Sequence, residues 1–361
     1  MPSFEKYILR KYLKFILLLL ITAFIFWFFG RKLDWQQVGA ILRTADPVYL
    51  ILAIASISLG YFLRSVRWGV LLEPITKTSL RELFATTTVG FTAVFLVGRA
   101  GEIVRPMWLP MRDRRVRPSA ALVTIMLERV FDLASLFCFF SISLIWFTVP
   151  PGREAEFETI KFAGNVLLAV VVAGIVALYI YHRIAPRVIA WSERMTGPKW
   201  VPAKLRAIFL SLLKQLAAAL DIFKSFRHLA WVALWTTALW LSIAVPTWLV
   251  ITAFGVEMRP VDSLFVMGVA SLGSLIPTPG GAAGAFHAAT AGSLILLGLP
   301  PHQAAAISII MHLVYFAPAV VFGLYYFFHG DISWERFRSL LSSENAEREI
   351  KSDSPDFVPE S

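Results

Sequence analysis

Six apolar segments of this 361-residue chain are long enough to cross a lipid bilayer. They lie at about 13–30, 47–66, 119–147, 161–182, 229–252 and 304–328, and a transmembrane helix needs roughly 20 apolar residues. Hydrophobic residues make up 57% of the chain and charged residues only 16%, which is too few charges to cover the surface of a soluble globule. These features predict an all-α polytopic membrane protein.

The two ends of the chain carry separate signals. The first apolar segment follows basic residues as in a signal peptide, but it ends in the bulky run FWFF at 26–29 instead of a small-residue cleavage site. We therefore expect a retained first span. Residues 342–361 are polar and acidic and contain proline, which predicts a disordered tail after an integral membrane domain over 1–341.

Two further apolar segments are too short for a plain span. Residues 83–98 lie between Glu82 and Arg99, and 263–299 is interrupted by the sequence PTPGG at 277–281. Loop charge indicates how they lie, because cytoplasmic loops carry an excess of Lys and Arg. The loops 99–118 and 183–228 are basic, whereas 148–160 is acidic, so we expect the first two inside, together with both termini. The net charge of +10 is explained by these loops, so no nucleic-acid partner is expected.

This charge distribution requires 83–98 to enter from the cytoplasm and return to it. Residues 263–299 then form a second hairpin that enters from outside. The prediction is six full transmembrane helices plus two re-entrant helical hairpins, with halves at about 13–147 and 161–328 arranged as an inverted repeat. Eight plain spans are the alternative. Residues 199–228, in the cytoplasmic region that joins the halves, have the period of an amphipathic helix on the inner leaflet, or they extend the next span.

The first candidate site segment is GRAGEIVRP at 98–106, where the first re-entrant segment ends. Its candidate residues are Arg99, Gly101, Glu102 and Arg105. The guanidinium groups have the geometry to hold a phosphate, and Glu102 and Arg105 are spaced to pair on a helix. The alternative is an ordinary solvated loop.

The second candidate site segment lies in the middle of the 119–147 span. Glu128, Arg129 and Asp132 place three charges within five residues of an apolar helix, and Glu128 and Asp132 share a face. Charges at this depth are costly and usually face a cavity or a partner. They line a polar site or form a structural ion-pair node between helices.

The third candidate site segment combines a helix break with two histidines in apolar surroundings. A helix that resumes after the break presents free N–H groups that attract anions, and a buried histidine can carry a proton. The alternative is that each histidine is a neutral hydrogen-bonding group between helices. The candidate residues are Pro279, Gly280, Gly281, Gly284, His287 and His312.

The three segments in this order resemble the flippase-like membrane domain of lysylphosphatidylglycerol synthases and their stand-alone relatives. The resemblance extends to about residue 330 and implies a helical bundle with re-entrant segments that handles an anionic or polyprenyl-type lipid. Where the family pattern suggests a Glu after the Pro-Gly-Gly run, this chain has His287. Only about 30 residues follow the last span, so we do not expect this chain to aminoacylate lipid by itself.

A lipid flippase or transporter is therefore the leading hypothesis, with a membrane lipid as its partner and the cell membrane as its location. The chain has no nucleotide-binding P-loop, only one cysteine and no His-x-x-x-His spacing, so no cofactor, metal or catalytic residue is assigned. The alternatives are an intramembrane enzyme acting on a lipid-linked substrate, such as a glycosyl or phosphoryl transferase, and a non-catalytic partner of a lipid-modifying enzyme. A homo-oligomer is also compatible with the sequence.

Overall fold

The computed structural model describes residues 35–146, 152, 154–195, 203–276 and 279–329. Within these ranges the chain forms eleven α-helices and two short 3-10 helices, with no strand, which confirms the all-α prediction. The predicted first span at 13–30 and the predicted tail at 342–361 lie outside the described residues. The elements are α2 (Trp35–Arg43), α3 (Pro47–Leu72), α4 (Leu80–Val97), η1 (Gly98–Ile103), α5 (Val104–Arg112), α6 (Pro118–Trp146), α7 (Glu154–Met195), α8 (Ala203–Ala219), η2 (Leu220–Lys224), α9 (Phe226–Ala253), α10 (Pro260–Gly273), α11 (Pro279–Leu296) and α12 (Pro301–Phe328).

The other five predicted spans correspond to α3, α6, α7, α9 and α12. All of these except α6 are both long and apolar enough to cross a membrane. The exception, α6, has 29 residues but carries the predicted charged segment near its middle. Local signals set where the helices begin: the Asp46 side chain accepts a hydrogen bond from the backbone N–H of Val48 at 2.8 Å, and proline opens α3, α10 and α12.

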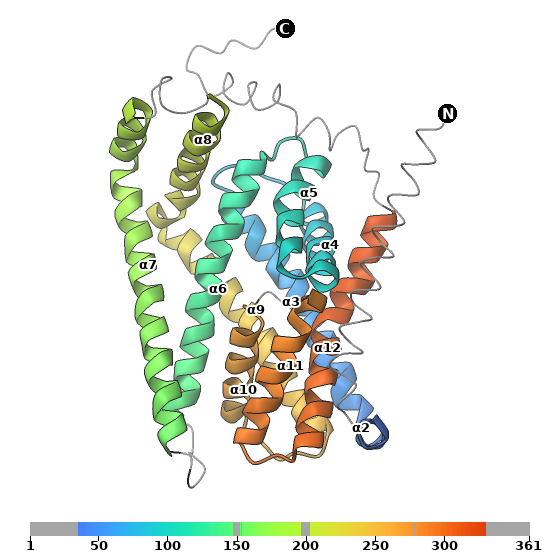
Figure 1. The fold of residues 1–361 in the computed structure, drawn as a ribbon. Coiled ribbons are helices and arrows are strands. Elements are labelled where there is room, and N and C mark those ends of the chain that lie inside the picture. Colours follow the sequence, from blue (N-terminus) through green and yellow to red (C-terminus); the bar gives the residue numbers. More distant parts are fainter. Residues whose placement is uncertain (1–34, 147–151, 153, 196–202, 277–278, 330–361) are drawn as a thin grey trace.

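The predicted hairpin within 83–98 is wrong, because this segment lies in a single helix, α4, and the chain turns back through η1 and α5, inside the predicted 99–118 loop. The second short segment, 263–299, does form two helices, α10 and α11, on either side of the predicted break. In the first hairpin α4 and α5 pack side by side and are joined by η1, and in the second hairpin α10 packs against α11. Figure 1 shows the first hairpin in the upper half of the bundle and the second in the lower half. Their inner ends meet, because α11 contacts both α4 and η1. Gly101 permits the tight turn of η1, since a Cβ atom there would lie only 2.4 Å from the carbonyl carbon of Ala93.

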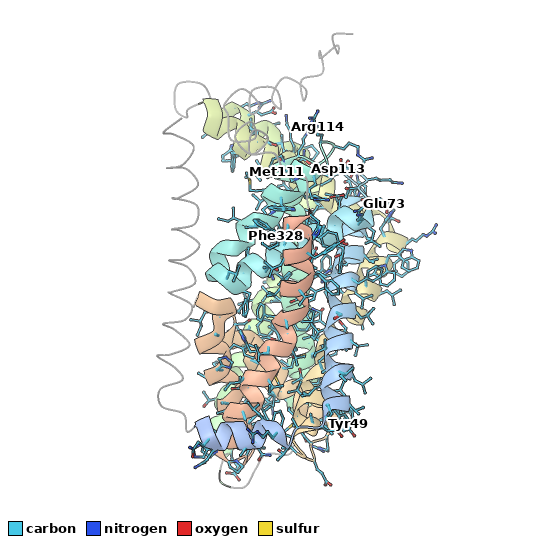
Figure 2. All side chains as sticks on the ribbon, turned by 90° about the vertical axis from the view of Figure 1, so that its right-hand side faces the viewer. Tyr49, Glu73, Met111, Asp113, Arg114 and Phe328 are labelled. Atoms are coloured by element: carbon cyan, nitrogen blue, oxygen red, sulfur yellow. The ribbon has the colours of Figure 1, made fainter. Side chains whose placement is uncertain are left out.

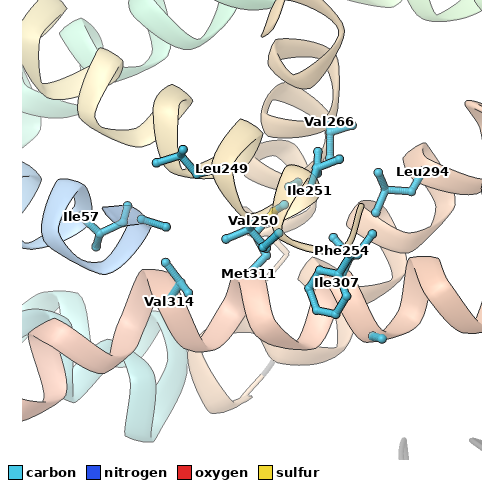
Figure 3. Packing of buried hydrophobic residues seen from close by; sticks show 14 of the residues in the cluster. Ile57, Leu249, Val250, Ile251, Phe254, Val266, Leu294, Ile307, Met311 and Val314 are labelled. Carbon is cyan, nitrogen blue, oxygen red and sulfur yellow. The ribbon is translucent and has the colours of Figure 1, made fainter. Parts of the chain in front are cut away.

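The helices pack in a reciprocal pattern around a central pair formed by α3 and α9. The first hairpin packs through α4 against α12, and the second packs through α10 against α6 (Figure 1). Each hairpin therefore lies against the last long helix of the other half of the chain. The largest apolar core cluster joins α9, α11 and α12, with Val250, Ile251, Ile307 and Met311 fully buried (Figure 3).

The segment predicted as amphipathic, 199–228, is a separate helix, α8, followed by η2. It is not continuous with α9, because the Ser225 side chain caps the start of α9. Leu212 and Leu216 of α8 pack against Val123 and Leu127 of α6, and α7 lies alongside (Figure 1). Residues 196–202 are outside the described part of the chain.

One end of the bundle carries the polar turns that flank the first hairpin. Figure 2 shows Glu73, Asp113 and Arg114 at this end and Tyr49 at the opposite one. The Asp113 carboxylate accepts hydrogen bonds from Arg115 Nη2 at 2.7 Å and from the Thr78 hydroxyl at 2.6 Å. These donors, Arg115 first, lower the pKa of Asp113 to about 2.

Candidate functional site

A buried chain of ion pairs joins α3, α5 and α6. Asp132 on α6 receives Arg64 at 3.0 Å on one carboxylate oxygen and Arg67 at 2.7 Å on the other. Both arginines lie on α3 with i,i+3 spacing, so they leave the helix on one face. One helical turn before Asp132, Glu128 pairs with Arg105 of α5 at 2.7 Å and lies 3.5 Å from Arg67. The result is a continuous alternation of positive and negative groups across three helices.

This network is desolvated. The side chains of Arg67, Glu128 and Arg105 are 0%, 1% and 3% exposed, respectively. Aromatic rings cover the guanidinium groups: Arg105 lies over Trp68 at 4.4 Å, and Arg64 lies over Phe91 at 5.0 Å. A charge buried in this way is tolerated only while its partner remains, so the network fixes how α3, α5 and α6 pack together.

Arg129 is held differently from the other arginines. Its side chain is 35% exposed, and its ion pairs are long, at 3.5 Å to Glu102 of η1 and 3.9 Å to Asp132. The Arg129 Nε atom has no hydrogen-bond partner among the described residues. Arg129 therefore differs from the buried arginines of this cluster in being both partly exposed and loosely paired, which leaves it room for a further ligand. Among the described residues, the cluster holds four arginines and three carboxylates, which is one positive charge more than negative.

A cavity of about 280 Å³ opens beside this cluster. Charged side chains form one wall, and the second hairpin, α9 and α12 form the others. Most of the lining is apolar or aromatic, with two serines at the inner end of α10. The cavity therefore has one charged end, which we call the charged pole, formed by Arg64, Glu102, Arg129 and Asp132, and apolar walls elsewhere. The lining includes Tyr61, Arg64, Phe91, Glu102, Arg129, Asp132, Trp240, Ser271, Ser274, Gly281, Ala282, Phe286, Tyr315 and Phe316.

The helix break of the second hairpin forms part of the cavity wall. Gly280, Gly281 and Ala282 all have left-handed backbone conformations, with φ of 70°, 65° and 63°. Glycine adopts this region freely, but alanine resists it, so Ala282 is locally strained. Phe316 of α12 packs directly beneath Gly281, where a Cβ atom would lie 3.1 Å from the ring.

The two predicted histidines lie together behind this wall. The ring centroids of His287 and His312 are 4.9 Å apart, and His312 Nε2 is 3.3 Å from the carbonyl oxygen of Gly281. Neither histidine lines the cavity itself, from which Phe286 and Phe316 separate them. Within the described ranges, no group of three or more acidic, histidine or cysteine side chains is arranged to hold a metal.

Six of the predicted site residues lie at the cavity or in the ion-pair network beside it. Glu102, Arg129, Asp132 and Gly281 line the cavity, and Arg105 and Glu128 lie behind them in the ion-pair network. The predicted i,i+3 pair between Glu102 and Arg105 does not form, because buried Arg105 pairs with Glu128 at its own depth while Glu102 pairs with Arg129.

The remaining predicted site residues take structural positions or lie beyond what is described. Gly101 forms the η1 turn, Gly280 lies in the helix break, and Gly284 is buried in α11. The side chains of Arg99 and Pro279 lie outside the described part of the structure.

Arg64 and Arg67 are absent from the predicted site, although they supply two of the network's guanidinium groups. Their signal is present in the sequence: two arginines with i,i+3 spacing lie in the apolar helix α3, which continues to Leu72 and not to the predicted end at residue 66. The same cost of charge in lipid that singles out Glu128 applies to them.

Comparison with known proteins gives a consistent result. Residues 15–323 match the family described as the lysylphosphatidylglycerol synthase TM region. The chain is 24% identical over 296 residues to a UPF0104 membrane protein of Methanothermobacter thermautotrophicus, a match that covers 78% of this chain and 85% of that protein. It is 23% identical over 343 residues to glycosyltransferase AglD of Haloferax volcanii, covering 85% of this chain but only 53% of AglD. No solved structure matches significantly.

Proposed function

Because the chain belongs to the lysylphosphatidylglycerol synthase transmembrane family, we propose that it is a flippase-like transporter of an anionic or polyprenyl-type lipid. The observation that carries this proposal is the cavity, which combines a charged pole with an apolar remainder. A lipid has the same division, with a charged head group and apolar chains. The head group would bind at the charged pole while the chains stay in the surrounding apolar space.

Arg129 is the proposed head-group ligand. Its side chain is partly exposed and its ion pairs are long, so a phosphate oxygen can contact the guanidinium group without breaking a tight pair. Arg64 supplies a second positive charge on the cavity wall. The net charge of +1 in the cluster favours a head group that brings negative charge, because an uncompensated charge in a low-dielectric site is costly.

Two measurements test this proposal. Wild-type protein and the variants Arg129→Ala and Arg114→Ala are reconstituted into phosphatidylcholine–phosphatidylglycerol vesicles with fluorescent phosphatidylglycerol, and dithionite quenching reports movement between leaflets. Arg129→Ala is expected to reduce the rate at least tenfold, whereas Arg114→Ala, an exposed arginine at the end of the bundle, leaves it unchanged. Native mass spectrometry is expected to show co-purified lipid on wild type and less of it on Arg129→Ala. Wild-type transport rates in Arg129→Ala contradict the proposed site.

We also propose that the two hairpins are re-entrant and that the halves form an inverted repeat. Two observations support this: α4 begins and α5 ends at the same end of the bundle, and each hairpin packs on the last long helix of the other half (Figure 1). The end that carries Asp113 and Arg114 is then cytoplasmic.

Cysteine labelling in intact cells distinguishes this arrangement from eight plain spans. In a Cys138→Ala background, Glu257→Cys is expected to react with an impermeant maleimide from outside, and Arg114→Cys only after permeabilisation. Labelling of Arg114→Cys from outside favours eight plain spans.

A second candidate function follows from the partial match to AglD. This chain spans about half the length of that relative, so in AglD the shared region accompanies a further region. A chain of this kind would then present lipid to a separate lipid-modifying enzyme. Transport leaves the lipid chemically unchanged, so a co-purified lipid that is altered only when a second protein is present favours this candidate.

A further inference from the structure

The His287–His312 pair lies where two hairpins and a long helix meet. His312 belongs to α12 and His287 to α11, and the two ring centroids are 4.9 Å apart. Three phenylalanine rings surround His312, with centroids at 4.9 Å for Phe316, 5.2 Å for Phe286 and 5.9 Å for Phe95 of α4. His312 is therefore buried among aromatic rings, and His287 beside it is half-buried.

The hydrogen bonds of the pair determine which nitrogens are free to accept a proton. A carbonyl oxygen can only accept, so His312 Nε2 carries the hydrogen that it donates to Gly281, and its Nδ1 keeps a lone pair. The Nδ1 of His287 is buried and has no hydrogen-bond partner among the described residues. His312 thus keeps a basic Nδ1, and the pair contains a second buried ring nitrogen, His287 Nδ1, that has no partner among the described residues.

The surroundings suit one added proton and not two. Burial opposes a charge on either ring, whereas the three tilted phenylalanine rings around His312 can partly stabilise an imidazolium. Two imidazolium rings at this separation would repel each other strongly in a low-dielectric site. The ionisable groups on the shared cavity wall come from four elements: Tyr61 and Arg64 of α3, Glu102 of η1, Arg129 and Asp132 of α6, and Tyr315 of α12. Helix α4 contributes Phe95 to the pair, and α9 and α10 contribute no ionisable side chain to the described lining.

We propose that His287 and His312 form a one-proton binding site whose occupancy is coupled to lipid movement through the helix break at Gly281. The connection is direct, because the Gly281 carbonyl accepts from His312 while Gly281 and Ala282 line the cavity. A proton taken up from water changes the charge beside this carbonyl and alters the strained left-handed turn that forms the cavity wall. The coupling rests on the proposed transport function, whereas proton binding by the pair does not.

Proton binding is tested without any lipid transport. Protein with 15N-labelled histidine is placed in phosphatidylcholine nanodiscs, and the signals of the pair are assigned from the variants His287→Gln and His312→Gln. His312 is expected as the Nε2–H tautomer at neutral pH, and the two rings together take up one proton as the pH falls. Uptake of two independent protons, or of none before the protein unfolds, overturns the proposed site.

Coupling is tested in vesicles that hold fluorescent phosphatidylglycerol and an internal pH dye. An imposed pH gradient is expected to change the wild-type translocation rate by up to about tenfold for each pH unit. His302→Gln, an exposed histidine at the start of α12, should keep this response, whereas His287→Gln and His312→Gln should lose it while still binding lipid. Wild-type translocation that ignores the gradient overturns the coupling and leaves the proposed function intact. An absence of translocation under every condition overturns both the proposed function and the coupling. The 15N measurement on the histidines still tests proton binding in that case, because it does not depend on transport.

Discussion

Replacing Glu128 with glutamine is expected to destabilise the protein by about 3–5 kcal/mol, the usual cost of removing one partner from a buried ion pair. The Glu128 side chain is 1% exposed, and its carboxylate is the partner of Arg105 at 2.7 Å and of Arg67 at 3.5 Å. Glutamine preserves the size of the side chain, so no cavity forms. Both arginines nevertheless remain in a dry interior with one fewer negative charge. The amide can return one hydrogen bond of about 1 kcal/mol, which puts the expected loss toward the lower end of the range.

The assay measures the fraction of protein cleaved by a protease as the denaturant concentration rises, with every variant in the same detergent. The midpoint and slope of this curve give the free energy of unfolding. The double variant Glu128→Gln with Arg105→Met removes one charge of each sign, and replacing a buried pair by apolar groups is often close to neutral. We expect it to recover at least half of the loss. Glu158→Gln, an exposed carboxylate on α7, serves as the control and should change stability by less than about 0.5 kcal/mol. A Glu128→Gln protein as stable as wild type would refute the reasoning, as would a double variant that is no better than Glu128→Gln.

Two further predictions concern the ends of the first hairpin. Gly101→Ala should cost about 1–3 kcal/mol because the new Cβ meets the backbone of Ala93, whereas Gly174→Ala, which has open space, should be neutral or slightly stabilising in the same unfolding assay. Asp113, whose pKa is lowered to about 2, should stabilise the folded state at neutral pH by about 1–3 kcal/mol. This contribution is lost as the pH falls from about 4, the ordinary pKa of an aspartate, through 2. Unfolding measured across this window should therefore be less pH-dependent in Asp113→Asn than in wild type, and equal pH profiles would exclude the proposed role of its hydrogen bonds to Arg115 and Thr78.

The helical architecture was largely predictable because hydropathy is a local property. Five predicted spans coincide with α3, α6, α7, α9 and α12, and the two short segments supply one helix, α4, and two helices, α10 and α11, to the hairpins. The boundaries were less predictable: α3 runs to Leu72 and α7 covers Glu154–Met195, because a helix continues beyond the apolar core when neighbouring helices and caps satisfy its backbone.

The candidate site was predictable only in part. The cost of charge in an apolar helix indicates Glu128, Arg129 and Asp132 directly. The same criterion applies to Arg64, which lies inside the predicted span 47–66, and to Arg67, which the predicted end at residue 66 placed outside it. The partners of these residues were not predictable. Spacing alone favours a pair between Glu102 and Arg105, but burial decides otherwise.

By itself, then, the amino-acid sequence determined that the chain is helical, that it belongs in a membrane, and which of its segments are too short or too charged to be ordinary spans. These properties depend on residues close together in the chain and on the solvent they require. Only the tertiary structure decided that Arg64 meets Asp132 across 68 residues and that His312 holds the carbonyl of Gly281 across 31. Such pairs depend on how distant helices pack, because a buried charge or polar group takes whichever partner lies at its own depth.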